Sequence, residues 1–207
     1  MSETKEKILL AALRLFAEDG YEAVPVSRIA GELGITKGAL YKHYKNKRDI
    51  FDSIVERMYA LDAERAEKYS VPQESYEESA SSYCNVALES LKEFTAAQLE
   101  FWTNDDFARN FRRMLTLEQY RNEEMSKLYH SCLTAGPTEY TENIFKEMMA
   151  RGALAGGDAK CLAVEFYAPL FLLVNVSDSA ENRFPCREIL NSHIERFIDL
   201  NSTAANG

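Results

Sequence analysis

Apolar residues recur at helical spacing in one segment of this chain after another. Val26, Ile29, Ala30 and Leu33, for example, fall at positions i, i+3, i+4 and i+7, whereas no convincing strand-like alternation of apolar and polar residues is found. The 207 residues include only nine Gly and five Pro, which is few for the many short turns of a sandwich or barrel. The sequence therefore predicts an all-α protein.

Capping and turn residues divide the chain into a series of predicted helices. The expected helices cover residues 4–19, 26–33, 37–44, 47–68, 86–102, a short segment after the cap at 104–106, then 115–132, 140–149, 159–176 and a last helix introduced by Phe184-Pro185. The pair Gly136-Pro137 is expected to end the helix over 115–132.

Charge is distributed unevenly along the chain. Residues 1–48 contain nine Lys/Arg and six Asp/Glu, a net charge of +3, whereas residues 49–207 contain 15 and 27, a net charge of −12. Residues 36–48 contain five basic residues, His43 and no acidic residue. Such a segment is either an ordinary solvated surface or a nucleic-acid contact, and the surrounding pattern decides between them.

That pattern is two short helices joined by a tight turn that contains Gly34. Leu40 lies on the same core as Ile29 and Leu33, so the opposite face of the helix after the turn is free to enter a DNA major groove. This face offers basic and aromatic side chains that can reach phosphates or base edges. Tyr44 can equally pack under the next helix.

The run from residue 8 to 51, and above all Ile29-Ala30 with residues 34–47, resembles the DNA-binding domain of the TetR family of transcriptional regulators. The resemblance implies a helix-turn-helix domain over 1–50, with a recognition helix at about 37–44, and a helical ligand-binding and dimerisation domain over 51–207. It implies a homodimer that binds a palindromic double-stranded operator. The N-terminal residues contain no apolar run of signal-peptide length and the four cysteines fit cytosolic thiols, so we expect a cytoplasmic protein. The implied DNA contacts are Ser27, Thr36, Lys37, Gly38, Ala39, Tyr41, Lys42, His43, Tyr44 and Lys47. Val24-Pro25 departs from the family, which often places a Thr or Ser cap there.

The helix predicted over 159–176 is apolar on nearly all sides, which suits a helix that contacts its own domain on one face and a partner subunit on the other. It falls short of the roughly 20 apolar residues of a membrane span, so we expect no membrane partner. The expected dimer contacts are Leu162, Phe166, Leu170, Leu173, Leu190, Ile194 and Phe197. The same residues can instead be internal core.

Aromatic residues concentrate in the middle of the chain and are candidates to line one effector pocket. The candidates are Tyr83, Phe101, Trp102, Phe107, Phe111, Met114, Tyr120 and Tyr129. They favour an apolar or aromatic small molecule, and the acidic surroundings also allow a lipophilic cation. Aromatic residues at helical spacing can equally be plain core.

Sequence signatures of enzymes are missing. The chain has no GxSxG, P-loop, GxGxxG or HExxH motif, its three histidines are far apart, and its four cysteines form no CxxC pair. We therefore expect no enzyme, metal or cofactor, and read the function as a repressor released by a small ligand. The alternative is a helical small-molecule-binding or enzyme-like protein whose N-terminal unit no longer binds DNA, and the basic segment 36–48 favours the regulator.

Overall fold

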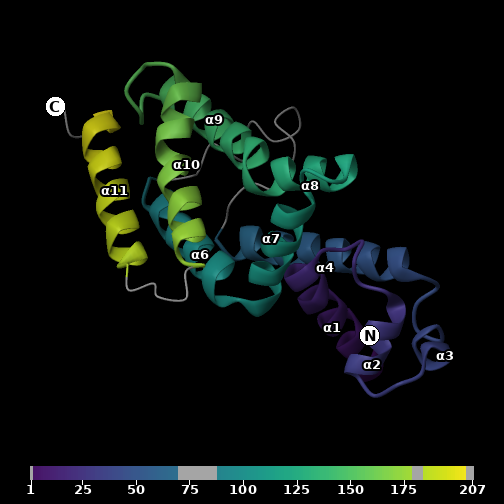
Figure 1. Cartoon of the computed structure of the whole chain (residues 1–207). Coiled ribbons are helices and arrows are strands. Elements are labelled where there is room, and N and C mark those ends of the chain that lie inside the picture. Colours follow the sequence, from purple (N-terminus) through teal and green to yellow (C-terminus); the bar gives the residue numbers. More distant parts are fainter. Residues whose placement is uncertain (1, 70–87, 179–183, 204–207) are drawn as a thin grey trace. The chain divides into compact units, whose positions relative to one another are not determined.

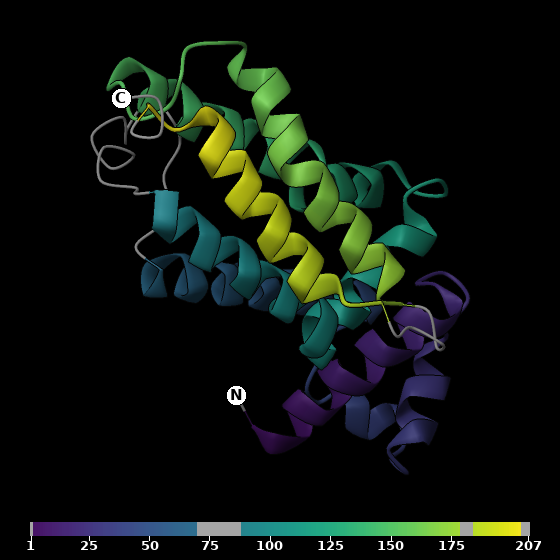
Figure 2. The ribbon, with the colours of Figure 1, turned by 90° about the vertical axis from the view of Figure 1, so that its left-hand side faces the viewer.

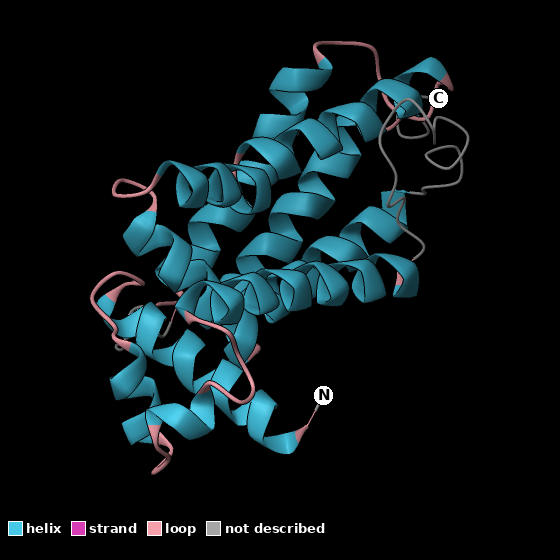
Figure 3. Cartoon of the chain, turned by 90° about the vertical axis from the view of Figure 1, so that its right-hand side faces the viewer, coloured by secondary structure: helices cyan, strands magenta, loops and turns pink. Residues whose placement is uncertain are grey.

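The computed structural model describes residues 2–69, 88–178 and 184–203, and within these ranges the chain is helical (Figures 1 and 3). The all-α prediction is therefore confirmed. The helices are α1 (Glu3–Asp19), α2 (Val26–Glu32), α3 (Lys37–Leu40), α4 (Lys47–Lys68), α6 (Leu88–Asn104), α7 (Asp106–Glu118), α8 (Glu123–Leu133), α9 (Ala135–Ala150), α10 (Ala159–Val176) and α11 (Cys186–Asn201). They form two compact units, Met1–Asp62 with Asp105–Tyr129, and Ala63–Asn104 with His130–Gly207.

In the first unit, α7 packs on α1, so residues 105–129 group with the N-terminal helices although the sequence analysis placed them in a domain over 51–207. The C-terminal end of α1 explains this close approach. Gly20 ends α1 with a φ of +90°, and a Cβ atom there would collide with the carboxylate of Glu118. Glu118 is fully buried and accepts the backbone N–H of Tyr21 at 2.9 Å.

The single helix expected over 115–132 is in fact two helices. α7 ends at Glu118, and α8 starts at Glu123 after a corner at residues 119–122. The side chain of Asn122 caps α8 by accepting the N–H groups of Glu124 at 2.9 Å and Met125 at 3.2 Å. α8 ends at Leu133, close to the expected end of that helix before Gly136-Pro137. The pair itself lies in the first turn of α9, where a proline is tolerated because its missing N–H would have no helical partner anyway.

The second unit is built around α10, which packs on α9, α11 and α6 (Figure 2). Its centre is a cluster of the rings of Phe145, Phe166 and Phe197, whose centroids lie 5.1–5.5 Å apart. Asp158 begins α10 by accepting the N–H groups of Lys160 and Cys161. By length and composition α10 is also a candidate to cross a membrane, a test that core helices of soluble proteins pass as well.

Most of the expected dimer contacts are internal to this unit, so that prediction is wrong for them. Phe166, Leu170, Leu173, Leu190, Ile194 and Phe197 are each at most 4% exposed, and Leu162 is half-buried. The reason is that α6 and α9 cover the face of α10 and α11 that carries these residues. The exposed apolar residues on these two helices are different ones: Val164, Leu172, Ile189 and Leu200.

The candidate effector residues are divided between the two units. Phe107, Phe111 and Met114 lie on the buried face of α7 in the first unit, together with the half-buried Tyr129, whereas Phe101 and Trp102 belong to the second unit. Tyr120 is 90% exposed at the α7–α8 corner. Tyr83 lies outside the described residues. The effector lining therefore remains a prediction, and periodicity alone does not identify which helices cover these residues.

Candidate nucleic-acid interface

The N-terminal unit contains the expected helix-turn-helix. α2 packs on α1 and on α3, and Ile29, Ala30 and Leu40 are buried between these short helices. The turn between α2 and α3 depends on Gly34, which has a φ of +65°, a backbone conformation that favours glycine. Pro25 precedes α2 and provides no side-chain cap, as the sequence suggested.

The recognition segment is shorter as a regular helix than the predicted range 37–44. Thr36 caps α3 by accepting the N–H of Ala39 at 3.1 Å, and regular helix ends at Leu40. Beyond it, Lys42 and His43 donate their backbone N–H groups to carbonyls three residues earlier, which tightens the last turn. Lys37, Tyr41 and Lys42 are exposed on this segment.

The predicted DNA contacts divide into three groups by exposure. Ser27, Thr36, Lys37, Gly38, Tyr41 and Lys42 are exposed, Ala39, His43 and Lys47 are half-buried, and Tyr44 is buried. The prediction for Tyr44 is wrong, because its ring is only 1% exposed. Its hydroxyl donates to the carbonyl oxygen of Lys5 at 3.1 Å, which fixes the start of α1 against the segment after α3.

The environment of Tyr44 gives a test of this contact at alkaline pH. Burial raises the pKa of the Tyr44 hydroxyl from 10.0 to about 12, and the carboxylates of Glu6 and Asp49 add to the effect. Because the folded pKa is higher than the unfolded one, this contribution to stability is complete below pH 10 and is lost as the pH rises through about 12.

Tyr44→Phe should lower the free energy of unfolding near pH 8 by about 0.5–1.5 kcal/mol, the usual contribution of one hydrogen bond. The loss of stability above pH 10 should also be smaller in Tyr44→Phe than in the parent protein. Urea unfolding at pH 8 and pH 11 measures both effects, with Tyr41→Phe, at an exposed position, as the control. Parallel pH dependence of Tyr44→Phe and the parent protein would contradict the burial of this hydroxyl.

Lys47 is held by the protein backbone. Its ammonium donates to the carbonyl oxygens of Tyr21 at 2.9 Å and Glu22 at 3.4 Å, and it lies 4.3 Å from the centre of the Tyr21 ring. These contacts join the start of α4 to the corner that follows α1. The contact of Lys47 with a DNA phosphate remains a prediction. The ammonium group that would make it already donates hydrogen bonds to two backbone carbonyl oxygens.

Ion pairing separates the cations of residues 2–62 into two classes. Lys7, Arg14, Arg28, Lys47, Arg48 and Arg57 each have a carboxylate within 4.0 Å. Lys37, Lys42 and Lys45 make no ion pair with any described residue. These three lysines are exposed and lie on α3 or within five residues of its end. The site is therefore a short, exposed segment of cations that have no ion-pair partner in the part of the chain that the structure describes.

Lys5 is a further candidate that the sequence analysis missed. Its ammonium lies 4.9 Å from the centre of the Tyr44 ring, so α1 brings it beside the segment that follows α3. It too makes no ion pair with a described residue. A signal for it was present in the sequence, because no acidic residue stands three or four positions from Lys5 along α1.

Comparison with known proteins gives the same reading of this region. Residues 8–54 match the model of a family described as bacterial regulatory proteins, tetR family. Over 56 residues the chain is 46% identical to the HTH-type transcriptional repressor BepR of Brucella suis, a match that covers 27% of each protein. The matched segments span 19–30% of the length of the curated relatives, so sequence similarity is concentrated in the DNA-binding region.

Solved structures resemble the whole chain. A SmeT–triclosan complex has a TM-score of 0.71 at 18% sequence identity, over 98% of this chain and 93% of that chain. A structure of SmeT described as the repressor of the Stenotrophomonas maltophilia multidrug efflux pump SmeDEF has a TM-score of 0.64 at 19% identity, over 96% and 90% of the two chains. At these identities the likeness concerns the fold.

Proposed function

We propose that this chain, a member of the tetR family of bacterial regulatory proteins, is a cytoplasmic repressor that binds a palindromic DNA operator as a homodimer and is released by a small molecule. The main support for this proposal is the ion pairing of the cations near α3. The exposed lysines 37, 42 and 45 have no intramolecular ion pair among the described residues, whereas six other cations of residues 2–62 are paired. Unpaired cations on and just after a recognition helix suit DNA phosphates, whose neutralisation releases counterions.

The proposed homodimer rests on the apolar residues that the second unit leaves exposed. Val164 and Leu172 lie two turns apart on α10 and are 50% and 61% exposed, while Ile189 and Leu200 are exposed on α11. Figure 1 shows these two helices side by side. Exposed apolar residues on adjacent helices suit a contact with the same helices of a second copy, and a two-fold dimer requires a two-fold operator.

The proposed effector is an apolar or aromatic compound. The second unit supplies aromatic side chains in α6, where Phe101 lies against Trp102 with ring centroids 5.2 Å apart. Arg65 stacks 3.8 Å from the centre of the Phe101 ring. The similar fold of a protein whose structure was solved as a triclosan complex supports an aromatic effector class.

Footprinting of the DNA upstream of its own gene tests the proposed function. We expect protection of two half-sites whose centres are one helical turn apart, about 10 bp, or a multiple of that distance, with two chains bound per site. Protection of a single half-site by one chain would contradict the dimer. Failure to bind duplex DNA of any sequence would contradict the proposed function as a whole.

A further inference from the structure

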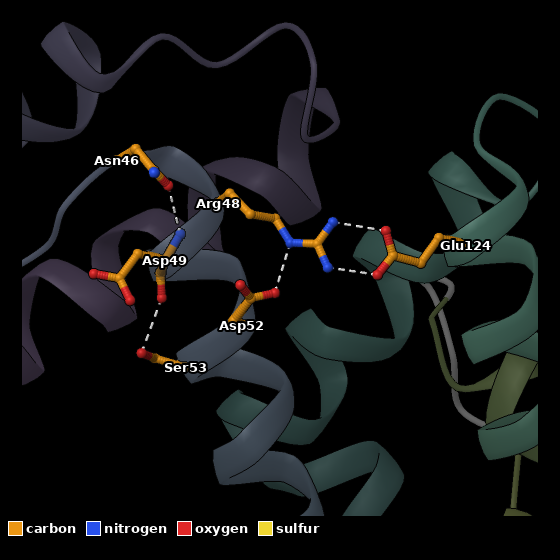
Figure 4. Close-up of polar contacts among 6 residues, drawn as sticks. All are labelled: Asn46, Arg48, Asp49, Asp52, Ser53 and Glu124. Atoms are coloured by element: carbon orange, nitrogen blue, oxygen red, sulfur yellow. Dashed lines mark hydrogen bonds and ion pairs between the residues drawn. The ribbon is translucent and has the colours of Figure 1, made fainter.

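Arg48, in the first turn of α4, is held by two carboxylates. Its two terminal nitrogens donate to the two carboxylate oxygens of Glu124 on α8 at 2.7 Å and 2.5 Å, and its Nε donates to Asp52 at 2.6 Å (Figure 4). Glu124 stands 76 residues farther along the chain. The pair therefore links the helix that follows the recognition segment to a helix outside the helix-turn-helix.

The backbone around Arg48 is fixed, whereas its side chain is exposed. Asn46 accepts the N–H of Asp49 at 2.8 Å (Figure 4). Asp49 in turn accepts the N–H of Lys45 at 2.8 Å, and the two bonds together form the start of α4. The side chain of Arg48 is 51% exposed and that of Glu124 49%. Arg48 also comes only three residues after Lys45, the last of the unpaired lysines. Its guanidinium is thus a solvent-accessible charge next to the proposed DNA-binding segment.

We propose that Glu124 competes with operator phosphate for Arg48. A carboxylate and a phosphate both offer two oxygens in the geometry that a guanidinium group binds, so the same fork of N–H groups can hold only one of them at a time. While Glu124 holds Arg48, this cation is withheld from DNA. A change in the direction of α4 or α8 that separates the two side chains would release it to a phosphate. This inference rests on the proposed function and names a regulatory contact of its DNA site.

The chemistry of the pair suits such an exchange. The hydrogen bonds from Arg48 lower the pKa of the Glu124 carboxyl, so the carboxylate stays ionised through the physiological pH range and protonation does not open the pair. An exposed ion pair is weak, because water and salt screen it. A DNA phosphate can therefore displace the carboxylate at a small cost in free energy.

Glu124→Gln tests the proposal directly, because the amide removes the charge of the competitor and preserves the size of the side chain. We expect the variant to bind duplex DNA about two- to fivefold more tightly, the range that corresponds to loss of an exposed ion pair. The dependence of log K on log salt should become steeper by up to about 0.9, the value for one additional phosphate contact. The gain should be similar on upstream DNA and on a random duplex, since phosphate contacts carry no sequence information.

Two variants separate this mechanism from a general change in charge. Glu123→Gln makes the same change one residue away, at a carboxylate that pairs with Lys127, and should give a smaller gain and an unchanged salt slope. In an Arg48→Gln background, Glu124→Gln should give no gain beyond that of Glu123→Gln. Equal effects of the substitutions at 123 and 124, or a full gain from Glu124→Gln without Arg48, would overturn the inference. In either case the parent protein would still bind DNA, so these outcomes leave the proposed function intact. A parent protein that binds no duplex DNA would overturn both.

Discussion

Replacing Lys37, Lys42 and Lys45 together by Gln should lower affinity for operator and random DNA by about two orders of magnitude near 0.15 M salt. Each phosphate contact contributes about 0.9 to the slope of log K against log salt, so loss of three contacts should flatten the slope by about 2.7. We expect these lysines to contact DNA phosphates because they are exposed and make no ion pair with a described residue. Their loss should leave the folded structure unchanged, which circular dichroism can verify.

A triple variant at paired lysines is the matched control. Lys7, Lys127 and Lys146 are each exposed and bonded to a carboxylate one turn away on the same helix. Their replacement by Gln changes the net charge by the same amount. We expect a much smaller loss of DNA affinity and a nearly constant salt slope. Equal losses in the two triple variants would show that net charge alone governs binding and that the segment around α3 is not the contact surface.

Ile194→Glu should unfold the second unit. Ile194 is fully buried in α11, and an unpaired charge in an apolar core costs several kcal/mol, a large part of the roughly 5–15 kcal/mol that stabilises a typical domain. If Ile194 were instead a dimer contact, as expected from the sequence, the same substitution would give a folded monomer. Thermal unfolding followed by circular dichroism distinguishes the two outcomes.

Leu172→Glu provides the comparison at an exposed apolar position. Leu172 is 61% exposed on α10, so the charge remains in contact with water in a single chain. This variant should stay folded and lose the dimer, as light scattering can measure. A folded Ile194→Glu protein, or a Leu172→Glu protein that remains fully dimeric, would contradict the proposed division of α10 and α11 into a core face and an exposed face.

The N-terminal helices could be predicted from the sequence because their signals are local. Gly20 and Gly34 end α1 and form the turn after α2, and Thr36 caps α3, as the spacing indicated. Each of these features depends on residues within four positions of one another. The corner between α7 and α8 was missed because the cap at Asn122 lies inside a stretch with continuous helical composition.

The faces of the later helices could not be predicted in the same way. Periodicity groups Leu170 with Leu173 on α10, but it does not reveal that neighbouring helices cover this face and leave Leu172 exposed. Glu118 is a stronger example. Nothing near Glu118 in the sequence predicts that its carboxylate is fully buried, because its partner, the N–H of Tyr21, lies 97 residues away. The carboxylate can approach that N–H only because residue 20 is a glycine, since a Cβ atom there would collide with it.

Operator binding by this chain can be measured by selecting binding sites from a pool of random duplexes. Anisotropy titration of the selected duplex and of the unselected pool then gives the two affinities. We expect enrichment of a two-fold symmetric sequence, bound at least about a thousandfold more tightly than the pool at physiological salt. Equal affinity for the selected duplex and the pool, with no sequence enriched, would contradict the claim that this chain is an operator-binding regulator.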